Sequence, residues 1–147
     1  MKNDHEIKIS RLIAVDRETL FDAWLEVEGI KRWMCPDEGV TVPDPKLEAK
    51  VGGKFDFTMK VGNELIPHFG EYFIIDRPNQ LQFTWNSVNT HNLDTMVYIT
   101  FKEISSDETE ITLVHKYLPD SDSAGDHTWG WNGIMDSLKK SMESAVV

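Results

Sequence analysis

The spacing of apolar residues in this 147-residue chain changes near its end, and that change limits the fold more than any single motif. Between about Val40 and Tyr117, apolar side chains recur mainly at every second residue, which is the spacing of half-buried β-strands. After Gly130 they recur every three or four residues, which is the spacing of an amphipathic helix. The chain therefore predicts a run of antiparallel strands followed by one long helix, whose apolar side must pack on the sheet.

The strand pattern is clearest at residues 54–61, where Phe55, Phe57, Met59 and Val61 alternate with polar residues. This alternation predicts one continuous strand with those four side chains facing the core. The same spacing predicts four further strands at residues 65–76, 81–88, 95–103 and 109–117.

Two short helices are predicted near the N-terminus, after a first strand at residues 5–14. Asp16 is a favourable N-cap for the first helix. The second is predicted at residues 28–34, because Pro36 ends any helical structure before it. With the other strands, this order predicts an α+β fold. In it a curved antiparallel sheet of about six to seven strands wraps around the long C-terminal helix and leaves a gap between them.

The C-terminal helix is predicted from a stripe of apolar side chains at spacings of three and four: Trp131, Ile134, Met135, Leu138, Met142 and Ala145. Lys139 and Glu143 lie on the opposite side, as expected for a helix with one buried face. The acidic segment 120–126 before it is predicted to be a solvated loop that caps the helix.

Charge and composition exclude several classes of function. The net charge is −10, from 15 basic and 25 acidic residues, which disfavours nucleic acid and anionic membranes as partners. The longest apolar run, Leu12–Val15, is too short to span a bilayer, and Met1–Glu6 lacks the apolar stretch of a signal peptide. The single cysteine fits a reducing cytoplasm. We expect one cytoplasmic domain over residues 1–147, either a monomer or a homodimer.

Six local signatures occur in a recognisable order along these predicted elements. They are Phe21-Asp22-Ala23-Trp24, Trp33 followed by Pro36, Gly52-Gly53-Lys54-Phe55, Gly70-Glu71-Tyr72, Pro78 with Leu81-Gln82-Phe83-Thr84-Trp85, and Gly130-Trp131. In this order the chain resembles the helix-grip (START-like, SRPBCC) superfamily, and within it the bacterial branch named after the activator of the ninety-kilodalton heat-shock chaperone's ATPase. It departs from many relatives at Trp33-Met34-Cys35-Pro36, where they carry Trp-Trp-Gly-Pro.

The resemblance implies a cavity between the sheet and the long helix, and hence a protein that binds a small apolar or amphipathic molecule. The side chains predicted to contact this ligand are Trp33, Phe57, Met59, His68, Tyr72, Phe83, Trp85, His115, Trp129, Trp131 and Met135. Two alternatives are an enzyme of the cyclase, aromatase or hydrolase type and a protein that contacts a chaperone and activates its ATPase. No cofactor or metal is expected, because the five histidines and one cysteine lack metal-ligand spacing.

His115 is the one candidate for catalysis. Alternation places it on the covered face with Ile111, Leu113 and Tyr117, where a neutral imidazole is able to act as a general base. A buried histidine held by hydrogen bonds is the more common case, so a structural role is the leading interpretation.

The inward face of residues 65–76 is left open by the pattern. His68 and Tyr72 share one face with Gly70, and Phe69 and Phe73 share the other. If Gly70 allows a close approach by the helix or a ligand, then His68 and Tyr72 line the cavity.

Overall fold

The computed structural model describes residues 4–144, so the first three residues and Ala145, the last residue of the predicted stripe, lie outside the described residues. The elements in order are β1 (His5–Ile13), α1 (Arg17–Ala23), α2 (Val27–Trp33), β2 (Val40–Thr41), β3 (Lys46–Leu47), β4 (Lys54–Asp56), β5 (Met59–Val61), β6 (Glu64–Ile66), β7 (Phe69–Asp76), β8 (Gln80–Trp85), η1 (Val88–Thr90), β9 (Thr95–Ser105), β10 (Glu108–Leu118) and α3 (Ser121–Ser144).

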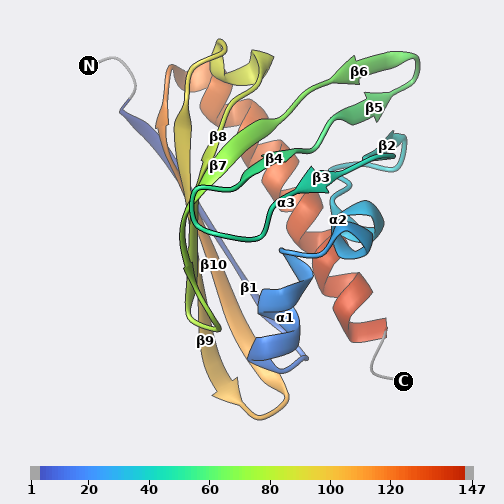
Figure 1. Cartoon of the computed structure of the whole chain (residues 1–147), viewed down its shortest axis with the longest axis vertical. Coiled ribbons are helices and arrows are strands. Elements are labelled where there is room, and N and C mark those ends of the chain that lie inside the picture. The colour runs from blue at the N-terminus through green and yellow to red at the C-terminus, as the bar shows by residue number, and fades with distance from the viewer. Residues whose placement is uncertain (1–3, 145–147) are drawn as a thin grey trace.

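The predicted α+β class and the predicted helix-grip arrangement are confirmed. Seven strands form an antiparallel sheet in the order β1-β10-β9-β8-β7-β4-β3, and a second sheet has the order β2-β5-β6. Figure 1 shows α3 running along one face of the larger sheet, with the smaller sheet branching off beside it. The two short helices follow β1, as the sequence predicts, and Asp16 caps α1 by accepting a hydrogen bond from the backbone N–H of Thr19.

The continuous strand predicted at residues 54–61 is wrong, because the chain leaves the larger sheet partway along it. β4 pairs with β7 in the larger sheet, whereas β5 pairs with β2 and β6 in the smaller one. Phe57 lies at the branch point, where its backbone N–H donates to the carbonyl of His68 over 2.7 Å. Phe55, Phe57 and Met59 are buried as predicted, but Val61 lies beyond the core and is 41% exposed.

The loop predicted at residues 120–126 is also wrong, because α3 begins at Ser121, but the predicted cap of the helix is confirmed at Asp120. The Asp120 carboxylate accepts a hydrogen bond of 2.8 Å from the backbone N–H of Ser123, which is the geometry of an N-cap. Acidic residues in the first helical turn are favoured by the helix dipole, so the same composition that predicts a loop also suits a helix start. Gly130 and Trp131 consequently lie in the middle of α3.

The alternation of β10 fails at Tyr117, which points outward and is 50% exposed. The register between β1 and β10 shifts here, and Tyr117 has a positive φ of 68°. This local irregularity turns Tyr117 out and places Leu118 in the core, while His115 is fully buried as predicted. One left-handed residue is therefore enough to reverse the expected side of the strand.

The inward face of residues 65–76 is settled by burial: His68 and Tyr72 are buried, whereas Phe69 and Phe73 are exposed. A Cβ added at Gly70 would overlap the carbonyl oxygen of Thr84 in β8. The close neighbour that Gly70 admits is therefore a strand, not the helix or a ligand.

A second close approach joins α3 to the segment after α2. A Cβ added at Gly133 would overlap the backbone carbonyl of Pro36, whereas one at the exposed Gly125 of the same helix meets nothing within 4 Å. The close backbone contact at Gly133 sets how near α3 lies to the N-terminal helices.

We predict opposite effects for alanine at these two glycines. Gly133→Ala should lower the free energy of unfolding by about 1–3 kcal/mol, because backbone atoms must move to admit the methyl group. Gly125→Ala should raise it by about 0.5–1 kcal/mol through helix propensity alone. Urea denaturation followed by circular dichroism measures both, and equal changes would contradict the close packing.

Candidate functional site

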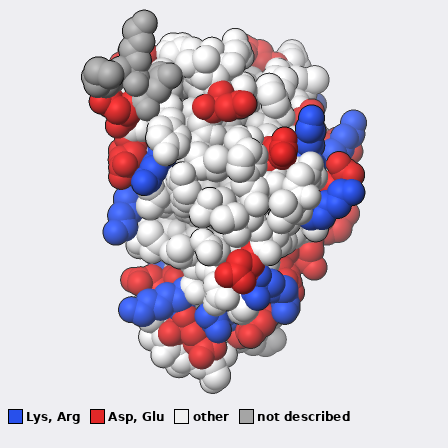
Figure 2. Space-filling view, turned by 60° about the vertical axis from the view of Figure 1, so that its left-hand side comes forward, with Lys and Arg blue, Asp and Glu red and all other residues white. Residues whose placement is uncertain are grey.

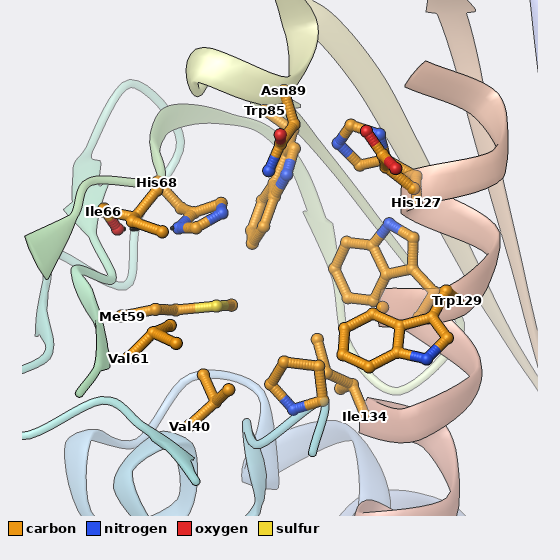
Figure 3. Close-up of a pocket in the computed structure, with 14 residues that line it drawn as sticks. Val40, Met59, Val61, Ile66, His68, Trp85, Asn89, His127, Trp129 and Ile134 are labelled. Atoms are coloured by element: carbon orange, nitrogen blue, oxygen red, sulfur yellow. Dashed lines mark hydrogen bonds between the residues drawn. The ribbon is translucent and has the colours of Figure 1, made fainter. Parts of the chain in front are cut away.

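A cavity of about 300 Å³ lies between α3, the hairpin β5–β6, the end of β8 and the segment around Pro36. Figure 3 shows His68, Ile66 and Met59 on one side of it and Trp129 with Ile134 across from them. Its lining residues are Pro36, Val40, Met59, Val61, Ile66, His68, Trp85, Asn89, Asp126, His127, Trp129, Gly130, Trp131 and Ile134. Most are apolar, and the polar ones gather near β8, η1 and the first turns of α3.

The structure brings five of the eleven predicted ligand contacts to this cavity. They are Met59, His68, Trp85, Trp129 and Trp131. The other six are buried but do not line it: Trp33, Phe57, Tyr72, Phe83, His115 and Met135. Alternation identifies inward side chains, but it does not separate those that line the cavity from those that pack the core around it.

Several of the residues that sequence reasoning missed lie on segments assigned to loops or turns, and the others lie in predicted strands or in the final helix. His127, Asp126 and Gly130 are on the part of α3 that the sequence predicted as a loop or as the opening of the helix. Ile134 and Val61 are missed residues with a usable signal, because Ile134 belongs to the predicted apolar stripe and Val61 to the predicted inward face of residues 54–61.

His115 is held by hydrogen bonds at both ring nitrogens. The indole Nε1 of Trp131 donates to His115 Nδ1 over 3.0 Å. Because an indole N–H is only a donor, Nδ1 must accept, and the proton of the neutral ring lies on Nε2. Nε2 then donates over 2.6 Å to Thr95 Oγ1, whose hydroxyl donates over 2.6 Å to the carbonyl of Trp85.

This network gives His115 a structural role. Burial lowers the pKa of His115 well below its usual value, and the neighbouring His127 lowers it further, so the ring is neutral. Both of its nitrogens are occupied and it does not line the cavity, which leaves no lone pair directed at a ligand. The geometry thus supports the structural interpretation over general-base catalysis.

His68 and His127 are the imidazoles that do line the cavity. His68 Nδ1 lies 3.0 Å from the carbonyl oxygen of Ile66, and His127 Nδ1 lies 2.7 Å from that of Ser123. A carbonyl oxygen only accepts, so each Nδ1 carries the ring proton and each Nε2 has a lone pair when the ring is neutral. Burial is the main cause that lowers the pKa of His68 to about 4, and burial also lowers that of His127.

The opening of the cavity is lined by apolar side chains that contact solvent. Trp129 of α3 is 60% exposed, and Val61 at the end of β5 is exposed as well. Within residues 4–144, no group of His, Cys, Asp and Glu side chains is placed to hold a metal ion. No helix in this described part of the chain is long and apolar enough to cross a membrane.

The curved sheet, the long helix and the cavity beside them define a helix-grip domain. Residues 14–143 match the family described as Activator of Hsp90 ATPase homolog 1-like protein. The chain therefore belongs to this family, which confirms the resemblance inferred from its sequence signatures. A search of curated proteins found no match.

Solved structures share this fold at low sequence identity. A protein from Chromobacterium violaceum has a TM-score of 0.82 and 19% identity, covering 94% of this chain and 96% of its own. An AHSA1-like protein from Aeromonas hydrophila has a TM-score of 0.77 and 20% identity, covering 96% of this chain and 94% of its own. An HSP90 activator from Plasmodium falciparum has a TM-score of 0.68 and 20% identity, covering 86% of each chain.

The hydrogen-bond network of His115 leads to a prediction for Thr95. Thr95→Val keeps the shape of the side chain but leaves the buried N–H of His115 without its acceptor. The free energy of unfolding should therefore fall by about 1–3 kcal/mol in urea denaturation. Thr100→Val, at an exposed position of the same strand, is the matched control and should change it by less than about 0.5 kcal/mol. Similar losses in both variants would contradict the network.

Proposed function

We propose that this chain, acting as one domain, binds a small and mainly apolar molecule in the cavity between α3 and the hairpin β5–β6. The observation that carries the proposal is the cavity itself, whose volume of about 300 Å³ is at the small end of the range for ligand sites. The single cysteine, Cys35, fits a reducing compartment, so we place this binding in the cytoplasm.

The composition of the cavity wall supports an apolar ligand. Figure 3 shows Met59, Ile66 and Ile134 along its sides and Trp85 in its upper part, and the indole ring of Trp131 also lines it. A ligand seated there would also cover part of the exposed ring of Trp129, and each Å² of apolar surface removed from water contributes roughly 25 cal/mol. The polar lining residues His68, Asn89, Asp126 and His127 can fix the orientation of an amphipathic molecule.

A glycine in the wall offers a way to fill the cavity. Gly130 lines it one helical turn before Ile134, so both residues lie on the same face of α3. A Cβ at Gly130 meets nothing within 4 Å, and the same holds for the exposed Gly125, which does not line the cavity. A side chain can therefore start at either position without a clash at Cβ, but only the one at residue 130 starts in the wall of the cavity.

We predict that Gly130→Leu weakens binding of N-phenyl-1-naphthylamine, an uncharged fluorescent probe, by at least about tenfold. Gly125→Leu should bind the probe like the unchanged protein. The measurement is a fluorescence titration, with thermal unfolding recorded to show that both variants are folded. The absence of saturable binding to the unchanged protein, or equal weakening in both variants, would overturn the proposal.

A second candidate function is contact with a chaperone, and one surface favours it. Figure 2 shows a broad central area without Lys, Arg, Asp or Glu on a chain whose net charge is −10. Phe73 of β7 and Tyr117 of β10 are exposed aromatic side chains on strands of the larger sheet. Such a surface is suited to a protein partner, and a structurally similar protein from Plasmodium falciparum is an HSP90 activator.

The two candidates differ in which residues they require. Chaperone activation would be measured as the ATPase rate of a bacterial Hsp90 with and without this chain. A rise in that rate that Phe73→Ser abolishes and Gly130→Leu does not would support the surface around Phe73 as the contact. An unchanged rate would argue against this second candidate and leave the ligand site unaffected.

A further inference from the structure

We propose that the cavity selects an uncharged aromatic molecule that carries a hydrogen-bond donor, of which phenols are the simplest, and that it rejects carboxylates. This inference rests on the proposed function and specifies the chemical class of the ligand. It depends on the proton positions of two imidazoles, on the charges around the cavity, and on the flat rings in its wall.

The first step concerns what the imidazoles offer. His68 comes from the link between β6 and β7, and His127 comes from α3, so they approach the cavity from different elements. The carbonyls of Ile66 and Ser123 hold the ring protons on Nδ1. The remaining nitrogen of each neutral ring, Nε2, is an acceptor. The backbone of Phe57 also hydrogen-bonds the His68 ring, which makes His127 the main acceptor for a ligand. A ligand that pairs with either ring must therefore supply an O–H or N–H group.

The second step concerns the charge of the two rings. Burial lowers the pKa of both, that of His68 to about 4, and a charge on His127 would further disfavour a charge on His68. Asp126 favours the charged form of His127, and Asp56 favours that of His68, but burial has the larger effect in each case. Both rings are consequently neutral acceptors near neutral pH, and neither provides a cation for an anionic ligand.

The third step concerns the other lining groups. None of the described residues that line the cavity is a lysine or an arginine. Asp126 lies at its exposed margin, and Asn89 is the other polar side chain there. A carboxylate placed in this cavity would lose its hydration and meet a carboxylate instead of a positive partner, which is strongly unfavourable. An uncharged donor meets no such penalty.

The fourth step concerns the body of the ligand. Trp85, Trp129 and Trp131 present indole rings to the cavity, and the His68 ring lies 5.3 Å from that of Trp85. Aromatic rings pack favourably on one another in offset or edge-to-face arrangements. The volume of about 300 Å³ limits the ligand to a small ring system. A compact aromatic body with one donor group satisfies both the apolar wall and the imidazole acceptors.

The test uses four compounds with one common ring body. These are naphthalene, 2-methoxynaphthalene, 2-naphthol and 2-naphthoate, and their dissociation constants are measured by calorimetry at pH 7.5. We expect 2-naphthol to bind about three- to tenfold more tightly than naphthalene and 2-methoxynaphthalene, as one hydrogen bond allows. We expect no measurable binding of 2-naphthoate.

Variants then identify the acceptor. The preference for 2-naphthol over 2-methoxynaphthalene should disappear in at least one of the variants His68→Leu and His127→Leu, namely the one that removes the acceptor. Both variants should still bind 2-methoxynaphthalene. His5→Leu is the matched control, because His5 does not line the cavity, and it should keep the full preference. A preference that persists in both cavity variants would overturn the assignment.

A measurement on the unchanged protein guards against variants that do not fold. Long-range ¹H–¹⁵N correlation spectra should show Nδ1 protonated in both rings, and 2-naphthol should shift the Nε2 resonance of at least one of them. Unchanged Nε2 resonances under saturating 2-naphthol would overturn the inference.

The outcomes separate this inference from the proposed function. Equal affinity for all four compounds, or tight binding of 2-naphthoate, would overturn the ligand class but leave a ligand-binding cavity in place. Failure of all four compounds and of N-phenyl-1-naphthylamine to bind would overturn both.

Discussion

The packing of α3 on the inner face of the larger sheet is the constraint on which the other features depend. Trp131 is central to it, because its ring lies 4.9 Å from that of Trp85 and its N–H donates to His115. Thr95 continues this network to the backbone of β8. A buried, fully paired network of this kind allows few alternative positions of the helix, since any shift would leave polar atoms without partners. The close backbone contact at Gly133 limits the same helix from its other side.

The cavity exists because part of the strand region leaves the larger sheet. After β4 the chain turns into the hairpin β5–β6, which pairs with β2 and stands beside α3. Side chains from the hairpin and from the helix line opposite sides of the cavity, which is open at the exposed ring of Trp129. The buried imidazoles of His68 and His127 are both held in one tautomer by backbone carbonyls, so this end of the cavity has a defined polarity. A site with fixed acceptors and an apolar wall is suited to recognition more than to proton transfer.

The sequence predicted the order of elements because their hydrophobic spacings are long and regular. It also identified inward residues such as His115, Trp85 and Met59 from alternation and family signatures. The prediction from sequence failed at positions where the local preference of the residues and the tertiary structure favour different conformations. The acidic residues after Asp120 are equally compatible with a loop and with the first turn of a helix. Only the tertiary structure decides between them: α3 begins at Ser121, and Asp120 accepts a hydrogen bond from the backbone N–H of Ser123. Tyr117 left the predicted face because an irregularity in strand pairing is not visible as a change in hydrophobicity.

What the sequence by itself determined is the set of surfaces that must be buried: one face of each strand and one side of the final helix. Burial of apolar area is a property of composition and spacing, so it can be read from the chain. Which of the buried side chains border empty space was decided only by the tertiary structure. Trp33 and Trp131 are alike in sequence character and both are buried, yet only Trp131 lines the cavity. The reason is that a cavity forms where two surfaces do not meet, and this depends on the relative placement of elements that are distant along the chain.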